Sequence, residues 1–281
     1  MIEAGKINKL KVLRKSDLGY MLTSGDEEVL MHFKQSLREL NNNEEVEVFI
    51  YTDKENRKTA TMQTPVLMMG KPNFAKVVQV IPGVGVFVDN NTPKDIFVSK
   101  DYLPYDETTW PTVDDVVFVE LKLKRGALVA KPVNRFDIIS LSKNVKYADL
   151  EKKEAYVLRF SEKGIGLITK DLVYVFVPKH QLRKNYRLGE EVTVTITKMV
   201  DKEAYGTLNE HKEILMDTDK ELILDYLNKH KGVMKLTAKS SSEDVEKILG
   251  ISRKAFKRAY GALYKEERIM FDEDKTYLLN K

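Results

Sequence analysis

Basic residues gather in two segments of this sequence, and their side chains are of the kind that binds phosphate groups. One segment, residues 159–187, also contains aromatic side chains, and the other is residues 253–265. Single-stranded nucleic acid is held by aromatic faces, on which stacking is worth ~1–3 kcal/mol per base, beside Lys or Arg that neutralise phosphates. The first segment offers seven candidates for such contacts: Arg159, Phe160, Lys170, Lys179, His180, Lys184 and Arg187. For Phe160, ordinary core packing is an equal alternative, and for nearby Phe176 it is the expected role.

The second segment is predicted to form a helix with one basic face. Its cations are Arg253, Lys254, Lys257, Arg258 and Lys265, and the first four share a face by their i, i+3 and i+4 spacing. Such a face can contact phosphates or enter a major groove. The alternative is a solvated face that Glu266 and Glu267 balance. Weaker candidates for nucleic-acid contact elsewhere are Phe33, Lys34, Phe87, Lys275 and Tyr277.

The sequence contains no recognisable motif for covalent or metal-assisted catalysis. The four histidines lack ligand spacing, and there is no Cys to act as nucleophile or zinc ligand. The Gly-x-Gly pairs at residues 83–85 and 164–166 lack the third Gly and the following helix of a dinucleotide fingerprint. We therefore expect a protein that is not an enzyme and that has no metal and no cofactor.

The composition is typical of a soluble chain with several domains. Its 281 residues fit two to four compact domains, and a net charge of +4 requires that any anionic partner be recognised by local patches. No run of about 18 apolar residues could span a bilayer, and the first residues lack the pattern of a secretory signal. We expect a cytoplasmic protein that does not contact membranes.

An internal repeat predicts how most of these residues are positioned. Three copies occur between residues 6 and 209, at intervals of roughly seventy residues. Each copy has a Gly-containing segment, a strand that ends in Lys, and a strand in which polar and apolar residues alternate. The Gly segments are 17–22, 83–88 and 164–169, the strands that end in Lys are 30–34, 96–100 and 175–179, and the alternating strands are 45–50, 115–121 and 191–196. About five short strands per copy predict closed barrels of the oligonucleotide-binding (OB) fold.

The three copies can be aligned by their glycines and lysines. This alignment equates Gly19, Gly85 and Gly166, and it places Met21 and Ile168 in the column of Phe87. It also places Lys34, Lys100 and Lys179 in one column. The Pro- and Gly-containing segment 64–72 and the segment 133–150, which is long enough for a short helix, are interpreted as linkers.

The pattern changes to a helical period after about residue 210. Helices are predicted at 219–229, with Asp217 or Asp219 as N-cap, at 243–249 after Ser241 or Ser242, and at 253–266 after Ser252. A β-hairpin is predicted at 268–279. Helix, helix, turn, helix and hairpin are the pattern of a winged helix-turn-helix domain.

These motifs resemble a known family. The Gly-Val-Phe-Val segment at 85–88, the Val-Pro segment at 177–178 and the alternating strands resemble S1-type RNA-binding modules. Three such modules followed by a winged helix resemble the conserved virulence factor B family of Gram-positive bacteria, and the resemblance covers residues 5 to 279. It implies an RNA-binding protein that regulates virulence gene expression after transcription.

The predicted fold is therefore multidomain and mainly β. It consists of three five-stranded OB-fold barrels of the S1 type at 1–63, 72–132 and 151–212, a linker at 133–150, and an α+β winged-helix domain at 216–281. The predicted partner is single-stranded RNA, bound by a monomer through one basic surface that the third barrel and the winged helix share.

Two other functions stay open at this point. One is a DNA-binding transcription regulator that uses the winged helix alone. The other is an interaction scaffold with the barrels as protein-binding surfaces, as the acidic and aromatic loop 102–111 around Trp110 indicates. In the RNA-binding hypothesis, acidic residues weaken binding to the second barrel, and the first two barrels act as spacers or dock other proteins.

Overall fold

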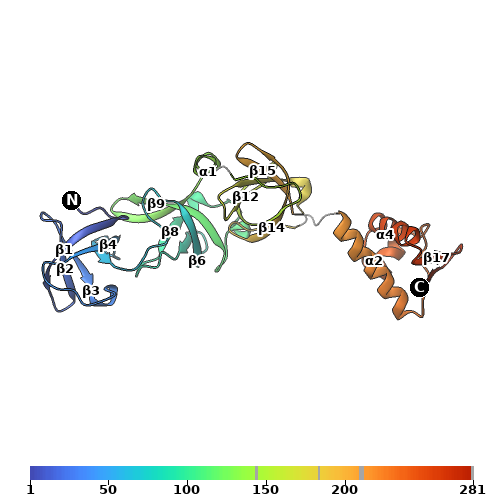
Figure 1. Ribbon diagram of the computed structural model, residues 1–281, viewed down its shortest axis with the longest axis horizontal. Coiled ribbons are helices and arrows are strands. Elements are labelled where there is room, and N and C mark those ends of the chain that lie inside the picture. Colours follow the sequence, from blue (N-terminus) through green and yellow to red (C-terminus); the bar gives the residue numbers. More distant parts are fainter. Residues whose placement is uncertain (143–144, 183, 209–211, 280–281) are drawn as a thin grey trace. The chain divides into compact units, whose positions relative to one another are not determined.

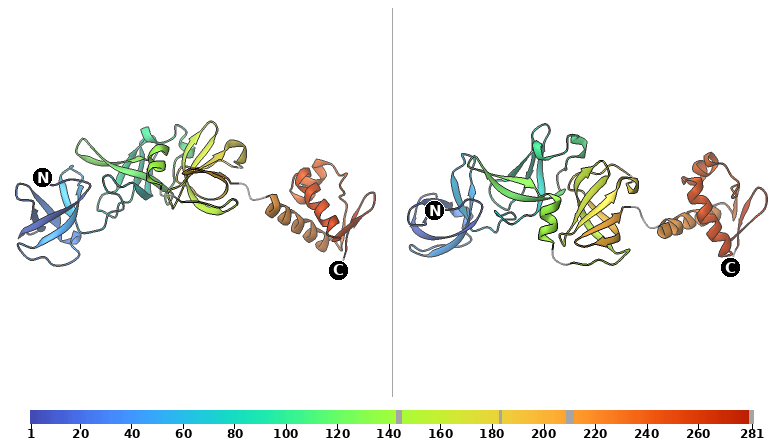
Figure 2. Two further views of the ribbon diagram at one scale, coloured as in Figure 1. Left: turned by 45° about the horizontal axis from the view of Figure 1, so that its top comes forward. Right: turned by 90° about the horizontal axis from the view of Figure 1, so that it is seen from above.

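The computed structural model of this chain describes residues 1–142, 145–182, 184–208 and 212–279, with the backbone alone for 212–218. Two compact units are present, Met1–Asn209 and Glu210–Lys281. The first contains three closed five-stranded barrels, and the second contains helices and a small sheet (Figures 1 and 2). The predicted mainly β architecture with a C-terminal winged helix is confirmed.

All three barrels have the same strand topology, in which the first strand pairs with the second and the fourth. The first barrel consists of β1 (Ile7–Lys15), β2 (Gly19–Thr23), β3 (Glu28–His32), β4 (Glu45–Thr52) and β5 (Lys58–Thr61). The second consists of β6 (Asn73–Ile81), β7 (Gly85–Val88), β8 (Ile96–Ser99), β9 (Val116–Lys124) and β10 (Ala127–Pro132). The third consists of β11 (Lys152–Ser161), β12 (Gly164–Thr169), β13 (Tyr174–Pro178), β14 (Glu191–Val200) and β15 (Glu203–Thr207).

Alternating side chains fill these barrels from the inside. In β13, for example, Val175 and Val177 are fully buried, whereas Phe176 between them faces outward and is half-buried. The first strand of each barrel carries a β-bulge at the same place, between Val12 and Arg14 in β1 and between Val157 and Arg159 in β11. A bulge bends a strand and strengthens its twist, which closes a small barrel.

One glycine per barrel is required by close packing. Gly19, Gly85 and Gly164 each begin the second strand, and a Cβ at these positions would lie 2.1–2.2 Å from a backbone carbonyl oxygen of the third strand. Gly164 pairs with Pro178, as Gly19 pairs with His32. The alignment that equated Gly166 with these glycines is therefore wrong by two residues.

The first copy also needs a shift, of one residue. A single 3₁₀ turn follows the third strand of each barrel, in η1 (Phe33–Gln35), η2 (Lys100–Tyr102) and η4 (Lys179–Gln181), whereas η3 (Glu107–Thr109) lies in a loop. Phe33, not Lys34, therefore occupies the column of Lys100 and Lys179. Equivalent hydrogen bonds support this register, because Thr61 bonds to Gln35 and Thr207 bonds to Gln181.

The segments between the barrels are packed rather than loose. Leu67 is fully buried in a cluster that also contains Phe49 of the first barrel and Val119 of the second. Helix α1 (Arg135–Leu141) lies in the segment 133–150, and its Ile138 is buried with Val133 in a cluster that joins the second and third barrels. These segments therefore help to hold the three barrels together.

The second unit has the expected order of elements. Its helices are α2 (Lys212–Lys229), α3 (Ser242–Leu249) and α4 (Arg253–Lys265), and its sheet has the order β16 (Val233–Met234), β18 (Thr276–Leu278), β17 (Ile269–Phe271). Ser241 caps α3 and Ser252 caps α4. Asp217 and Asp219 lie inside α2, so the N-cap predicted there is wrong, and β16 was not predicted.

Candidate nucleic-acid interface

A row of four residues crosses the outer face of the third barrel. Backbone pairing aligns Arg159 of β11 with Gly166 of β12, Gly166 with Phe176 of β13, and Phe176 with Tyr205 of β15. Because paired residues in neighbouring strands point to the same side, this third-barrel row presents one guanidinium and two rings together. The rings of Phe176 and Tyr205 meet edge to face at 6.2 Å. These are the group types that hold single-stranded nucleic acid.

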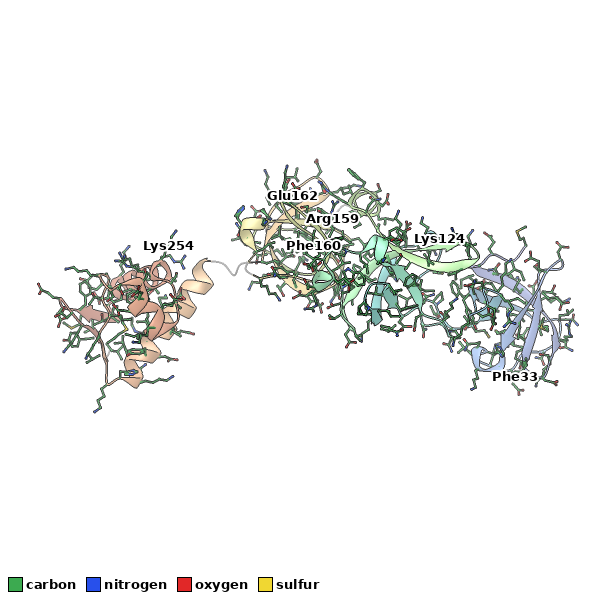
Figure 3. All side chains as sticks on the ribbon, turned by 180° about the vertical axis from the view of Figure 1, so that it is seen from behind. Phe33, Lys124, Arg159, Phe160, Glu162 and Lys254 are labelled. Carbon is green, nitrogen blue, oxygen red and sulfur yellow. The ribbon has the colours of Figure 1, made fainter. Side chains whose placement is uncertain are left out.

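The third-barrel row lies in a half-open hollow of about 530 Å³. Arg159 and Glu162 at its edge are labelled in Figure 3. Ten residues surround this hollow: Arg135, Arg159, Ser161, Glu162, Lys163, Tyr174, Phe176, Glu203, Ala204 and Tyr205. Tyr205 is 44% exposed, so its ring is accessible to a ligand from solvent.

Gly166 has a specific reason to lack a side chain. A Cβ there would lie 2.4 Å from the hydroxyl oxygen of Tyr174 and 2.7 Å from its ring. The ring of Tyr174 therefore covers the position that Phe87 occupies in the second barrel. Ile168, which the sequence alignment placed in that column, is fully buried two residues further along β12.

The equivalent rows of the other barrels carry different chemistry. In the second barrel the row is Gln79, Phe87, Phe97 and Val129, with the two rings 5.1 Å apart. In the first barrel it is Arg14, Met21, Leu30 and Thr59. Within the described residues, only the row of the third barrel therefore combines aromatic rings with a cation.

An ion pair bounds one side of the hollow. Arg135 of α1 donates from Nε and Nη2 to the two carboxylate oxygens of Glu203 in β15, at 2.5 and 2.6 Å. Its guanidinium carbon also lies 5.2 Å from the ring centre of Tyr174. Hydrogen bonding to Glu203 raises the pKa of Arg135, and burial raises the pKa of Tyr174. At neutral pH the hollow is therefore bounded by a charged guanidinium and a neutral phenol.

The predicted residues of the third barrel do not all lie together. Arg159 is exposed in the hollow, whereas its neighbour Phe160, also labelled in Figure 3, is half-buried against the barrel core. Lys179 and His180 are exposed in η4. Lys170 follows the far end of β12, where it forms ion pairs with Glu154 and Glu191 at 2.5 and 3.5 Å.

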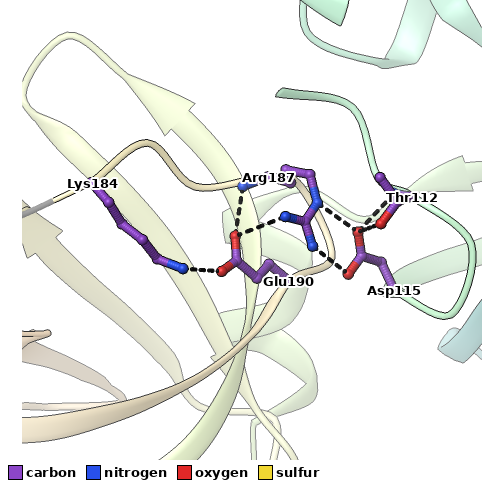
Figure 4. Close-up of polar contacts among 5 residues, drawn as sticks. All are labelled: Thr112, Asp115, Lys184, Arg187 and Glu190. Carbon is purple, nitrogen blue, oxygen red and sulfur yellow. Dashed lines mark hydrogen bonds and ion pairs between the residues drawn. The ribbon is translucent and has the colours of Figure 1, made fainter. Parts of the chain in front are cut away.

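Arg187 forms an ion pair that the sequence did not predict. Its guanidinium donates to both carboxylate oxygens of Asp115, in the second barrel, at 3.2 and 3.3 Å, as Figure 4 shows. Lys184 is exposed, but its ammonium group lies 2.6 Å from a carboxylate oxygen of Glu190. Because Asp115 accepts two hydrogen bonds from the guanidinium of Arg187, we interpret Arg187 as a contact between barrels.

Sequence reasoning missed Arg135, Tyr174 and Tyr205, and it assigned Phe176 to the core. The alternation of side chains along a strand could have indicated Phe176 and Tyr205. Each lies between two buried residues of its strand and must therefore face outward. Tyr174 and Arg135 could not be found in this way, since their positions depend on contacts between segments.

The second unit has a basic surface at the N-terminal end of α4. Arg253, Lys254 and Lys257 are exposed there, and Lys254 is labelled in Figure 3. They surround a shallow hollow of about 620 Å³ together with Ser242, Ser252 and Arg258. The first turn of α4 contains no acidic residue. Cations there add to the positive end of the helix dipole, which costs stability without an anion and attracts one.

The other candidates of this unit have distinct surroundings. Arg258 lies 3.7 Å from Asp219 of α2, so part of its charge serves to join two helices. Lys265 is exposed twelve residues after Arg253, at the opposite end of α4, about 18 Å along the helix axis. In the wing, Lys275 is exposed, whereas the hydroxyl of Tyr277 donates to Asp272 at 2.8 Å.

The first two barrels contain a few exposed candidates. Phe33, labelled in Figure 3, is 38% exposed, and the ammonium group of Lys15 lies 5.4 Å from its ring centre. Lys34 beside it is exposed, and Phe87 is half-buried. Trp110 is buried and donates from Nε1 to the carbonyl oxygen of Pro104 at 2.7 Å, which makes it the anchor of the acidic loop.

Two other kinds of feature are absent from the described residues. Among the residues that the structure describes, no group of three or more His, Asp or Glu is placed to hold a metal ion. In the same part of the chain, no helix is both long and apolar enough to cross a bilayer.

Models of known protein families match three parts of the chain. An S1 domain model matches residues 4–63, a model described as the CvfB first S1-like domain matches 73–128, which form the second barrel, and a CvfB-like winged helix domain model matches 221–278. Conserved virulence factor B of Staphylococcus aureus strain USA300 is 30% identical over 291 residues, which cover 99% of this chain and 94% of that protein. The chain belongs to the conserved virulence factor B family.

Other similar proteins extend this result. The uncharacterized protein YitL of Bacillus subtilis is 33% identical over 95% of this chain and 91% of its own length. A crystal structure of a multidomain protein with nucleic acid binding domains from Streptococcus pneumoniae TIGR4 has the same fold, with a TM-score of 0.66 and 23% identity over 98% of both chains. The S1 and winged-helix modules that the family models match in this chain are of the nucleic-acid-binding kind.

Proposed function

We propose that this protein is a cytoplasmic, monomeric, non-enzymatic regulator that binds single-stranded RNA and acts after transcription on gene expression, including virulence genes. The third barrel and the winged helix supply the binding surfaces. The observation that carries the proposal is the third-barrel row, in which Arg159 lies in line with two outward rings in an open hollow. Arginine and stacked rings bind bases and phosphates without a requirement for duplex structure.

The first experiment removes the stacking face. Tyr205→Ala should weaken binding of a uridine or cytidine decamer about 5- to 150-fold, the loss expected for one stacked base. Tyr105→Ala is the matched control, because this tyrosine is fully exposed in a loop of the second barrel. Equal affinities of wild type and Tyr205→Ala in fluorescence anisotropy would exclude the third-barrel row as the RNA site.

The second experiment tests the surface of α4. Arg253→Ala/Lys254→Ala/Lys257→Ala should lower affinity and flatten the dependence of log K on log salt by about 0.7 for each phosphate that the variant no longer neutralises. Lys229→Ala, an exposed lysine in the last turn of α2, is the control. If the triple variant keeps the wild-type salt slope, α4 does not contact the RNA backbone.

A combined variant tests whether both surfaces act on one RNA. If a single strand contacts both, the losses in binding free energy from Tyr205→Ala and the α4 triple variant should add for a long strand. On a short oligonucleotide that reaches one surface, only one change should have an effect.

A second candidate function follows from α4 alone. An exposed basic N-terminal end of a recognition helix is also the geometry that enters a DNA major groove, so a DNA-binding transcription regulator is the alternative. Competition between labelled single-stranded RNA and unlabelled duplex DNA distinguishes the two. Displacement of RNA by duplex DNA at equal concentration would favour the DNA-binding alternative.

The first two barrels have a separate proposed role. We propose that they position the third barrel and dock other proteins. We also propose domain limits at 1–63, 72–132, 151–212 and 216–281, with a linker at 133–150. The row of the first barrel contains no aromatic ring, and this supports a reduced role of that barrel in RNA binding.

A further inference from the structure

A second row on the third barrel runs beside the first and is covered. Pairing aligns Tyr156 of β11 with Ile168, Ile168 with Tyr174, and Tyr174 with Glu203. Tyr156, Ile168 and Tyr174 are buried by the cluster that joins the second and third barrels. Tyr174 and Glu203, at the end of this row, line the hollow, and there Arg135 of α1 binds Glu203.

The ion pair and the β11–β12 hairpin form opposite sides of the hollow. Arg135 and Glu203 bound it on the side of the covered row, and Ser161, Glu162 and Lys163 of the hairpin bound it on the other. The third-barrel row, with Phe176 and Tyr205, forms the floor between them. A volume of about 530 Å³ is in the range of sites that enclose one small organic group.

The ion pair keeps hydrogen-bonding capacity toward the hollow. Glu203 accepts hydrogen bonds from Nε and Nη2 of Arg135. The N–H groups of Nη1 and the second lone pair of each carboxylate oxygen therefore remain available to a ligand. The side chains of Arg135 and Glu203 are 41% and 25% exposed, so a ligand can reach both. A donor therefore lies next to an acceptor, and this is also how groups alternate on the Watson–Crick edge of a nucleobase.

We propose that the hollow takes one unstacked nucleobase of a bound RNA strand and that the Arg135–Glu203 pair reads its edge. The inference rests on the proposed RNA-binding function and adds base selection to it. Single-stranded RNA is recognised in this way elsewhere, by stacking of a splayed base combined with hydrogen bonds to its Watson–Crick edge. The linker helix α1 thus contributes a specificity residue from outside the barrel.

The test compares base preference and not affinity alone. Binding of the full chain to decamers of uridine, cytidine and adenosine, and to a uridine decamer with two central guanosines, is measured by fluorescence anisotropy. The charge-swapped variant Arg135→Glu/Glu203→Arg keeps an ion pair but exchanges donor and acceptor. We expect its affinity ratio between the preferred decamer and the weakest one to change by at least about fivefold, the discrimination of one good base contact.

Glu203→Gln provides a second test if the swapped variant does not fold. It keeps the shape of the side chain and replaces one acceptor oxygen by a donor, so the ratio should again change. A purely structural ion pair would leave the ranking of the four decamers unchanged in both variants, and that result would overturn the inference.

Two outcomes separate this inference from the proposed function. If wild type binds none of the decamers, both are wrong; if it binds them and Tyr205→Ala weakens all four while Glu203→Gln leaves their ratios unchanged, only base reading is wrong. Free nucleoside monophosphates are added as competitors in a further arm. Displacement of the decamer by micromolar monophosphate would mean that the hollow serves a free nucleotide, which would overturn the assignment to an RNA strand.

Discussion

The barrels require glycine at positions 19, 85 and 164, because there is no room for a side chain there. The first side-chain carbon of any other residue would lie about 2 Å from the oxygen of Met31, Val98 or Val177, far inside contact distance. Gly164 also has a φ of +153°, which residues with a side chain rarely adopt. These glycines therefore recur in all three copies because the second and third strands cross closely, and not because a ligand requires them.

Gly164→Ala should strongly destabilise the third barrel. Either the third strand must move or a rare backbone conformation must be kept, and such changes cost about 3 kcal/mol or more. Gly126→Ala is the control, since nothing lies within 4 Å of a Cβ there and only its φ of +80° is unfavourable. Its cost should be about 1 kcal/mol. Urea unfolding of both variants measures the difference, and equal midpoints would contradict the packing argument.

Tyr147 should make the third barrel sensitive to alkali. Its hydroxyl is bonded to Thr169 at 2.8 Å and donates to Asp171 at 3.1 Å, and burial raises its pKa to about 12. An unfolded tyrosine titrates near pH ~10, so the folded state holds this proton more tightly. The resulting stabilisation is complete below pH ~10 and is lost as the pH rises through ~12.

Tyr147→Phe removes this titration. The free energy of unfolding of wild type, minus that of the variant, should be constant from pH 7 to 9 and should then fall by up to about 2–3 kcal/mol toward pH 12. Denaturant unfolding at a series of pH values measures it. A difference that stays constant to pH 12 would show that the hydroxyl titrates equally in both states.

At the scale of elements, the sequence predicts what depends on local pattern. The alternating strands and the helices that follow Ser241 and Ser252 are confirmed, because each signal lies within the element itself. The register between strands, in contrast, was not predicted correctly from the sequence. Pairing is decided by close contact across strands, as at Gly164 and Pro178, and two of the three copies were therefore misaligned by one or two residues.

The candidate site was predicted only in part for the same reason. The place of Arg159 depends only on the outward position in its own strand, and the structure puts it in the hollow. Tyr205 and Phe176 become neighbours through the parallel pairing of β13 and β15, and Arg135 reaches the hollow from a segment interpreted as a linker. Arg187 fits a basic cluster in sequence, but its partner Asp115 lies 72 residues away.

Arg258→Ala should loosen the packing of α4 on α2. The pair with Asp219 is 3.7 Å long, and the side chains are 36% and 12% exposed, so we expect a loss of about 1 kcal/mol. Lys257→Ala, the exposed neighbour, should change stability by less than about 0.5 kcal/mol. Hydrogen exchange of the α4 amides in the full chain gives both values. If the two variants exchange alike, Arg258 is a surface cation and belongs with the nucleic-acid candidates.

At the scale of the whole molecule, the first unit is more than three barrels in series. Phe49 of the first barrel shares a buried cluster with the second, and Phe118 of the second shares one with Tyr156 and Tyr174 of the third. Backbone hydrogen bonds also cross the second junction, from Val116 to Gly189 and from Leu188 to Thr109, at 3.0 and 2.9 Å. Shared apolar clusters and backbone bonds resist domain motion, so these barrels should move as one body.

Arg187→Ala should weaken the junction between the second and third barrels without unfolding either. It leaves the carboxylate of Asp115, only 10% exposed, with Thr112 as its remaining partner, which costs about 1–3 kcal/mol. The amides of Val116 and Leu188, which donate across the junction, should then exchange faster with solvent, whereas those of the β13 interior should not.

Lys184→Ala is the matched control, because Lys184 pairs with Glu190 inside the third barrel. Hydrogen exchange with mass spectrometry compares the two variants over peptides that contain Val116 and Leu188. Faster exchange in Arg187→Ala alone would show that Arg187 supports the junction. The part that Asp115→Ala/Arg187→Ala recovers is the cost of the unpaired Asp115 carboxylate, and the part that stays lost is the contribution of the pair itself. Equal protection in all variants would instead assign the junction to the apolar cluster around Phe118 and Ile138.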